Sequence, residues 1–327
     1  MKFNDFIGNE KTIEKLGALI ESNRFPHALV IDGERGIGKK TLARLLAQTL
    51  VCRGDDKPCN ACAQCKKARD GVHPDIFEHI PSGKANSFHV DTVRKIIEDA
   101  YIKPNEAKYK IYILANAHCM NASAQNALLK ILEEPPEYVI FILTAESKSA
   151  LLSTVLSRSV VISLEGVNGD DGAKYLVNHD SSTDFLTAKR TIEAFNGNIG
   201  KAMESLGDGK ANEIIAVCKK MCNALVGDNE FALLSECAFF QRDREAIVFA
   251  CDLLKNIFRD ALLADGDDGF ISGQKDTAML LRARLSRQRL LNLLNECTQL
   301  KSEALMNSNN SLLITRLCCR LRQAAGK

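Results

Sequence analysis

The chain has 327 residues, of which 46% are hydrophobic and 26% are charged, values that are ordinary for a folded globular protein. This composition excludes a disordered chain, a collagen-like repeat and a low-complexity scaffold. The 43 Lys and Arg residues nearly balance the 41 Asp and Glu residues and leave a formal net charge of +2. Such a balance excludes a protein that binds nucleic acid over its whole surface, although a local basic patch stays possible.

The beginning of the chain lacks the apolar stretch of a secretion signal, and no segment reaches the roughly 18 consecutive apolar residues that a membrane helix needs. Without an export signal, the 12 cysteines are expected to be reduced thiols or metal ligands rather than disulfides. We therefore expect a cytoplasmic protein.

Short apolar runs alternate with helical patterns in the first half of the chain. Five runs predict strands, at Ala28–Asp32, Asp75–Ile80, Lys110–Leu114, Tyr138–Thr144 and Val160–Leu164. Apolar residues at helical spacing predict helices over Lys40–Cys52, over the segment from an Asp91 cap to Tyr101, and over Ser123–Glu133. Strands that alternate with helices favour a parallel sheet that is covered on both faces.

Beyond Leu164 the strand signals stop. A turn-rich linker, Glu165–Asp170, leads into a small helical segment with an internal turn at 195–198. From Asp208 onward the pattern is helical almost throughout. We expect an α/β domain followed by all-α domains, with boundaries at 1–165, 166–207 and 208–327.

A glycine-rich loop joins the first predicted strand to the first predicted helix, and this context is typical of a P-loop. The candidate phosphate-binding residues are Gly33, Gly36, Gly38, Lys39, Lys40 and Thr41. Glycines let backbone N–H groups surround phosphate oxygens, and Lys39 can reach the outer phosphates. However, Lys40 stands where a Ser or Thr should bind magnesium, and Thr41 lies about 100° further round the helix. The loop is therefore degenerate: it binds nucleotide weakly or not at all, or keeps it as a structural ligand.

ATP hydrolysis also needs acidic residues at the end of a neighbouring strand, to hold magnesium and polarise the attacking water. The strand Lys110–Leu114 runs instead into Ala115 and Asn116. Alanine cannot bind a metal, and asparagine has no basic group that accepts a proton. We expect that this chain does not hydrolyse ATP.

Four cysteines lie close together in the pattern C-x6-C-x2-C-x2-C, at Cys52, Cys59, Cys62 and Cys65. Four thiolates with no open position are typical of a structural zinc site. A redox dithiol and an iron–sulfur cluster are the alternatives, and His73 is a conceivable competing ligand. The other eight cysteines lie mainly in helical stretches and are expected to pack as small apolar side chains.

Three segments resemble the clamp-loader branch of the AAA+ proteins: Lys110–His118, Ala124–Pro136 and Leu156–Ser159. The run Asn126–Pro136 is highly specific to that branch, and the resemblance covers about the first 200 residues. It implies an AAA+ P-loop domain with a parallel sheet and a zinc knob at 52–65. A small helical lid domain and a C-terminal helical collar domain for oligomerisation would follow.

The resemblance also implies a role for Arg158. Ser157, Arg158 and Ser159 match the family's Ser-Arg-Cys motif, whose arginine enters the ATP site of a neighbouring subunit in trans. The planar guanidinium fits a γ-phosphate and neutralises charge that develops in the transition state. An ordinary surface ion pair is the alternative. The stretch 197–200, where active relatives carry a nucleotide-sensing arginine, has none.

With its catalytic residues missing, the chain resembles a non-catalytic clamp-loader subunit of a DNA polymerase III holoenzyme, and the resemblance implies that it lacks the polymerase active site. Its partners would be the ATPase subunits and delta in a hetero-pentamer, and, through that complex, the sliding clamp and primer–template DNA. Structural zinc would be its cofactor. The alternatives are an ATP-hydrolysing motor subunit of the same assembly and an AAA+ adaptor in DNA repair or recombination.

Overall fold

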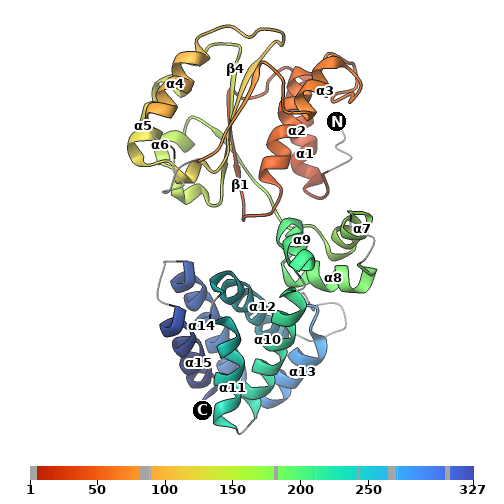
Figure 1. The fold of residues 1–327 in the computed structure, drawn as a ribbon, viewed down its shortest axis with the longest axis vertical. Helices are drawn as coiled ribbons and strands as arrows, with labels where there is room; N and C mark the ends of the chain where they lie inside the picture. Colours follow the sequence, from red (N-terminus) through yellow and green to blue (C-terminus); the bar gives the residue numbers. More distant parts are fainter. Residues whose placement is uncertain are drawn as a thin grey trace. The chain divides into compact units, whose positions relative to one another are not determined.

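The computed structural model describes residues 6–81, 88, 90–179, 183–208, 210–227, 229–241, 243–263, 270, 272–305 and 310–327. The chain forms two compact units, Met1–Gly166 and Val167–Lys327, each of which is described by itself. The first contains a sheet with helices, and the second contains helices alone among its described residues (Figure 1).

The first unit is built on a five-stranded sheet in which every strand pair is parallel. Its order is β2-β3-β4-β1-β5, so that β1 lies between β4 and β5. The strands are β1 (Ala28–Asp32), β2 (Ile76–His79), β3 (Lys110–Leu114), β4 (Val139–Ala145) and β5 (Val160–Ser163). All five runs that were predicted as strands form strands of this sheet.

Helices cover both faces of the sheet, as predicted (Figure 1). Successive strand residues point to opposite faces. Leu29 and Ile31 of β1 therefore pack with one group of helices, and Ala28 and Val30 pack with the other. The first group contains α1 (Glu10–Glu21) and α2 (Lys39–Val51), and the second contains α4 (Val90–Ala100), α5 (Ala122–Glu133) and α6 (Ser153–Leu156). The short helix α3 (Ala63–Arg69) follows α2, and the 3-10 turns are η1 (Ala117–Cys119) and η2 (Lys148–Ala150).

The bounds of three predicted helices are corrected. Helix α2 begins one residue earlier than expected, after an N-cap at Gly38, and ends one residue earlier, because Cys52 is already extended. Asp91 does not cap α4 but lies in its first turn, where its carboxylate interacts favourably with the positive end of the helix dipole. Helix α5 begins at Ala122, because the Asn121 side chain accepts the Ala124 N–H at 2.9 Å and caps it.

The second unit has two clusters of buried apolar side chains. The smaller cluster lies among α7 (Gly169–His179), α8 (Phe185–Ala194) and α9 (Ile199–Asp208). The larger one joins α10 (Lys210–Val226), α11 (Glu230–Cys237), α12 (Arg244–Leu263), α13 (Lys275–Arg284), α14 (Arg287–Leu305) and α15 (Asn310–Ala325), with the 3-10 turn η3 (Ala238–Phe240). The rings of Phe195 and Phe249 stack with centroids 3.9 Å apart, within this unit. The predicted division at 207/208 therefore stays a proposal.

Most cysteines outside the cluster of four are core residues, as expected. Six are buried: Cys218, Cys222, Cys237, Cys251, Cys297 and Cys318. Burial raises the pKa of each of these thiols, which keeps them neutral and apolar. Cys319 is exposed and Cys119 is partly buried, so the expectation is wrong for Cys319. None of the helices in the described part of the chain is long and apolar enough to cross a membrane.

Candidate functional site

The P-loop turns from β1 into α2, and its lysine is folded back onto the loop itself. Gly36 and Gly38 have φ values of 86° and 97°, which glycine adopts without strain. Lys39 Nζ donates to the carbonyl oxygens of Gly33 at 2.6 Å and Glu34 at 2.8 Å. The Lys39 residue is only 7% exposed. The cation that would meet a phosphate is thus held by backbone oxygens of its own loop.

An aromatic ring covers the same loop. A Cβ atom placed on Gly38 would lie 3.1 Å from Cε2 of Phe6, so the ring is in close contact with the backbone there. Phe6 also packs against the buried cluster formed with α1 and α2. Sequence reasoning missed Phe6, because a single aromatic residue 32 positions before Gly38 carries no motif signal.

Lys40 stands at the magnesium-ligand position and has a partner of its own. Its Nζ lies 2.5 Å from Glu78 Oε1 on β2, and Arg44 Nε lies 2.6 Å from Glu78 Oε2. Burial raises the pKa of the Glu78 carboxyl, but the two cations outweigh it and hold that pKa below its usual value. Thr41 is exposed on the next position of α2. Of the two residues after Lys39, Lys40 therefore forms an ion pair and Thr41 places its hydroxyl at the surface.

The carboxyl ends of β1, β3 and β4 meet beside this loop. Ala115 is buried, and the exposed Asn116 has a left-handed backbone whose N–H donates to Thr144 Oγ1 at 2.9 Å. Asp32, the acid at the end of β1, accepts the Lys148 N–H at 2.6 Å and the Ser163 hydroxyl at 3.1 Å. Its carboxylate thus ties η2 and the end of β5 to the end of β1 and does not replace the missing acids after β3.

Arg158 follows α6 and is partly exposed, with 32% of its side chain accessible. Its Nη2 lies 2.5 Å from Glu133 Oε1 at the end of α5. Its Nη1 donates to Thr154 O at 3.0 Å and to the hydroxyl of the exposed Ser157 at 3.3 Å. The guanidinium therefore lies at the surface of the first unit and is held from two sides by its own chain.

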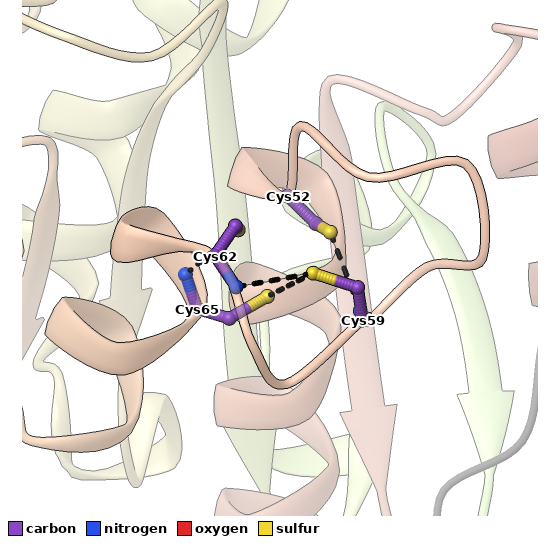
Figure 2. Close-up of side chains that lie close together, drawn as sticks. All are labelled: Cys52, Cys59, Cys62 and Cys65. Carbon is purple, nitrogen blue, oxygen red and sulfur yellow. Dashed lines mark hydrogen bonds between the residues drawn. The ribbon is translucent and has the colours of Figure 1, made fainter.

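The four clustered cysteines come together between the end of α2 and the start of α3 (Figure 2). Their sulfur atoms all lie within 4.8 Å of one another, and Cys59 Sγ is 3.9 Å from Cys65 Sγ. Four sulfurs bound at 2.3 Å around a tetrahedral ion lie about 3.8 Å apart. The donor set and its spacing therefore fit a metal ion and fit a zinc knob.

Backbone N–H groups point at these sulfurs, as Figure 2 shows for several of them. Cys62 N lies 3.4 Å from Cys59 Sγ, and Cys65 N lies 3.4 Å from Cys62 Sγ. The N–H donors lower the pKa of Cys59, and at Cys62 they outweigh burial and lower the pKa to about 6. Burial raises the pKa of Cys65 to about 12. Donors of this kind stabilise thiolates, which are the form that binds a metal.

His73 lies beside this knob but both of its ring nitrogens are engaged elsewhere. Its Nε2 lies 2.6 Å from Gln64 Oε1, and its Nδ1 accepts the Asp75 N–H at 3.0 Å. Burial lowers the pKa of His73, which keeps the imidazole neutral. His73 is therefore a supporting residue, and the cluster contains cysteines only.

Comparison with known proteins finds similar sequences among the subunits of DNA polymerase III. Residues 8–168 match the family described as "DNA polymerase III, delta subunit". A DNA polymerase III subunit gamma from Buchnera aphidicola subsp. Acyrthosiphon pisum (strain APS) is 31% identical over 64% of this chain and 61% of its own length. A DNA polymerase III subunit delta' from Bacillus subtilis (strain 168) is 29% identical over 74% of both chains.

A DNA polymerase III subunit tau from the same Bacillus strain is 36% identical, but the chain spans only 28% of it. The chain thus covers less than two thirds of the gamma and tau relatives. A solved gamma subunit-related protein from Thermotoga maritima msb8 aligns with 96% of this chain at 17% identity and a TM-score of 0.42. A structural similarity with a TM-score this low carries no information about function.

A P-loop after an interior strand of a parallel α/β sheet, followed by a helical region, is the AAA+ architecture that the sequence predicted. Within that class, the match to the delta-subunit family and the similarity to a delta' subunit support a delta-prime-like clamp-loader subunit of DNA polymerase III. The predicted family is thereby confirmed.

Proposed function

We propose that the protein is a catalytically silent subunit of the clamp loader in the DNA polymerase III holoenzyme and acts in DNA replication. It joins the ATPase subunits and delta in a hetero-pentamer and gives Arg158 in trans to the ATP site of a neighbour. The complex loads the sliding clamp onto primer–template DNA. This chain hydrolyses no ATP by itself and carries no polymerase active site, and we expect it in the cytoplasm.

The observation that carries this proposal is the P-loop whose cations are already satisfied within the chain. Lys39 is bound to two loop carbonyls, and Lys40 is paired with Glu78. A nucleotide with magnesium would have to displace Lys39 and would find an ammonium group where it needs a hydroxyl ligand. The end of β3 offers Ala115 and Asn116, which supply no general base.

Arg158 is suited to act elsewhere because it lies at the surface, away from the interior of its own domain. An arginine donated in trans is worth ~10³–10⁵ in the rate of phosphoryl transfer. It acts by neutralising charge that develops on the transferred phosphoryl group. Loss of the chain's own catalytic acids does not affect this contribution.

Reconstitution of the complex with the other clamp-loader subunits encoded in the same genome tests the proposal. Arg158→Ala should leave assembly intact, as judged by gel filtration. It should remove the turnover of the site that receives the arginine, and so lower the ATPase stimulated by clamp and primed DNA. Arg158→Lys keeps the charge but loses the planar fork, and should recover only a small part of the rate.

Arg94→Ala serves as the surface control, since Arg94 is an exposed arginine on α4 that pairs only weakly, at 3.4 Å from Asp91. This variant should retain the stimulated ATPase. Unchanged ATPase in the assembled Arg158→Ala complex would remove Arg158 from the proposed role. An adaptor in DNA repair or recombination would instead fail to assemble with the clamp-loader subunits.

The similarity to gamma and tau subunits leaves one alternative function open, that of an ATP-hydrolysing motor subunit. Steady-state ATP turnover by the purified chain, abolished by Lys39→Ala, would support the motor. Mass spectrometry of the gently extracted protein would reveal a nucleotide that is retained without turnover. We expect neither result, because Lys40 and Ala115 replace groups that every step of hydrolysis needs.

We further propose that the cysteine cluster holds structural zinc through all four thiolates. Four sulfur ligands leave no open position for substrate or water, so the ion would stabilise the knob and take no part in chemistry. Nearby cysteine N–H groups would then act as outer-shell donors to the metal-bound sulfurs.

A further inference from the structure

Arg158 is held in the described first unit by a carboxylate that the sequence did not single out. Glu133 is the last residue of α5, and its Oε1 lies 2.5 Å from Arg158 Nη2. The other terminal nitrogen, Nη1, donates to Thr154 O and Ser157 Oγ. Both terminal nitrogens of the guanidinium are therefore engaged inside the chain.

A carboxylate and a phosphate compete for the same donors. Each binds the guanidinium through oxygen atoms that accept two N–H groups of the planar fork. As long as Glu133 is paired with Nη2, that edge of the fork is not available to a terminal phosphate. The pair is also easily exchanged, since 50% of the Glu133 side chain and 32% of the Arg158 side chain are accessible to water.

We propose that Glu133 is a positioning residue for ATP hydrolysis at the neighbouring site. It holds Arg158 against its own chain until the terminal phosphate of the neighbour's nucleotide replaces the carboxylate. Exchange of the Glu133 carboxylate for the phosphate is thus one of the steps by which the neighbouring site becomes active. This inference rests on the proposed function of Arg158.

The chain offers a matched control at the next residue. Glu134 is also an exposed glutamate at the end of α5, but its carboxylate makes no ion pair or hydrogen bond with Arg158 among the residues that the structure describes. A general effect of removing one negative charge from this surface would be the same at both positions. An effect on Arg158 itself would be confined to Glu133.

The test uses the reconstituted clamp-loader complex with Glu133→Gln, Glu134→Gln or the unmodified chain. Glu133→Gln should raise the basal ATPase, measured without clamp and DNA, about two- to fivefold, the range set by loss of an exposed ion pair. The apparent KM for ATP should fall in the same basal assay. The fully stimulated rate should stay unchanged, because Arg158 has already left Glu133 there. Raising the salt concentration should narrow the basal difference, since salt screens the pair.

Two further variants separate this inference from the proposed function. In the Arg158→Ala background, Glu133→Gln should change nothing, because the effect passes through Arg158. Glu133→Asp should restore the basal rate toward that of the unmodified chain. If Arg158→Ala lowers the stimulated ATPase but Glu133→Gln fails to raise the basal rate, only the role of Glu133 is wrong. An equal rise of the basal ATPase with Glu134→Gln would also overturn the role of Glu133. An unchanged stimulated ATPase in the Arg158→Ala complex would overturn the proposed function itself.

Discussion

Asp75 is a fully buried carboxylate that holds a loop by its backbone. Its two oxygens accept the N–H groups of Asn105, Glu106 and Ala107 at 2.6 to 2.8 Å. Burial raises the pKa of the Asp75 carboxyl, but these donors outweigh it and hold the pKa below its usual value. Glu106 in turn pairs at 2.6 Å with Lys67 of α3, the helix that carries Cys65. One buried charge therefore ties the loop before β3 to the metal-binding segment.

Asp75→Asn should destabilise the protein by about 1–3 kcal/mol at pH 7, because an amide NH₂ group would face backbone N–H donors. The folded-state pKa of Asp75 is lowered, so its stabilising effect is present above the unfolded value of about 3.9 and is lost as the pH falls through the folded value. Urea unfolding at pH 7 and near pH 2 should show the difference between the two proteins shrinking in acid, because only below the unfolded pKa does the stabilising charge disappear. Asp70→Asn, at a carboxylate that is 62% exposed, should change stability by less than about 0.5 kcal/mol. An equal loss at both pH values would contradict the role of the charge.

At the scale of elements, the sheet could be predicted from the sequence because its interior strands are buried on both faces and read as continuous apolar runs. The P-loop could be predicted because its glycines and lysine stand at fixed spacings. The end of the helix before Pro135 could be predicted because the residue before a proline is restricted to extended backbone. Helix α1 was missed although its amphipathic pattern was available. Helix α3 has seven residues, too short for a periodic pattern.

The contacts that define the candidate site could not be predicted from the sequence, for a different reason. Glu78 meets Lys40 only because β2 and α2 pack in space, and Glu133 meets Arg158 only because α5 ends beside α6. Such pairs are set by tertiary packing and leave no periodicity or motif along the chain. Sequence reasoning identified one partner of each pair and could not identify the other.

The cysteine knob gives a prediction at the scale of an element. The purified chain should contain about one zinc ion per molecule by elemental mass spectrometry, as expected for a single four-thiolate site. Cys62→Ser should lose the metal, because one of four ligands is gone, while Cys119→Ser, at a partly buried cysteine outside the cluster, should retain it. Acidification should release the ion as the thiolates become protonated.

Other metal contents would identify the alternatives for the knob. Iron with a visible absorption band would indicate an iron–sulfur cluster, and titratable thiols without any metal would indicate a redox dithiol. Full zinc occupancy in Cys62→Ser would exclude the four-cysteine site. Gly54→Ala should weaken binding in either metal case, since a Cβ there would lie 2.8 Å from Cys59 Cβ.

At the scale of the whole molecule, each compact unit has its own hydrophobic core. Every cluster of buried apolar side chains among the described residues lies within either Met1–Gly166 or Val167–Lys327. The P-loop, Arg158 and the cysteine knob all belong to the first unit, whereas the second supplies the helices expected to form a collar. The candidate nucleotide site and the helices proposed for oligomerisation thus lie in different compact units of the chain.

Fragments cut at this boundary test that separation. Because each has a closed core, residues 1–166 and 167–327 should both fold, each with a single cooperative thermal transition. Fragment 167–327 should join the other clamp-loader subunits in gel filtration, because the collar is proposed to carry assembly, and the resulting complex should lack the ATPase that depends on Arg158. Fragment 1–166 should bind zinc yet remain outside the complex. Stable assembly of fragment 1–166 alone would instead assign oligomerisation to the AAA+ domain.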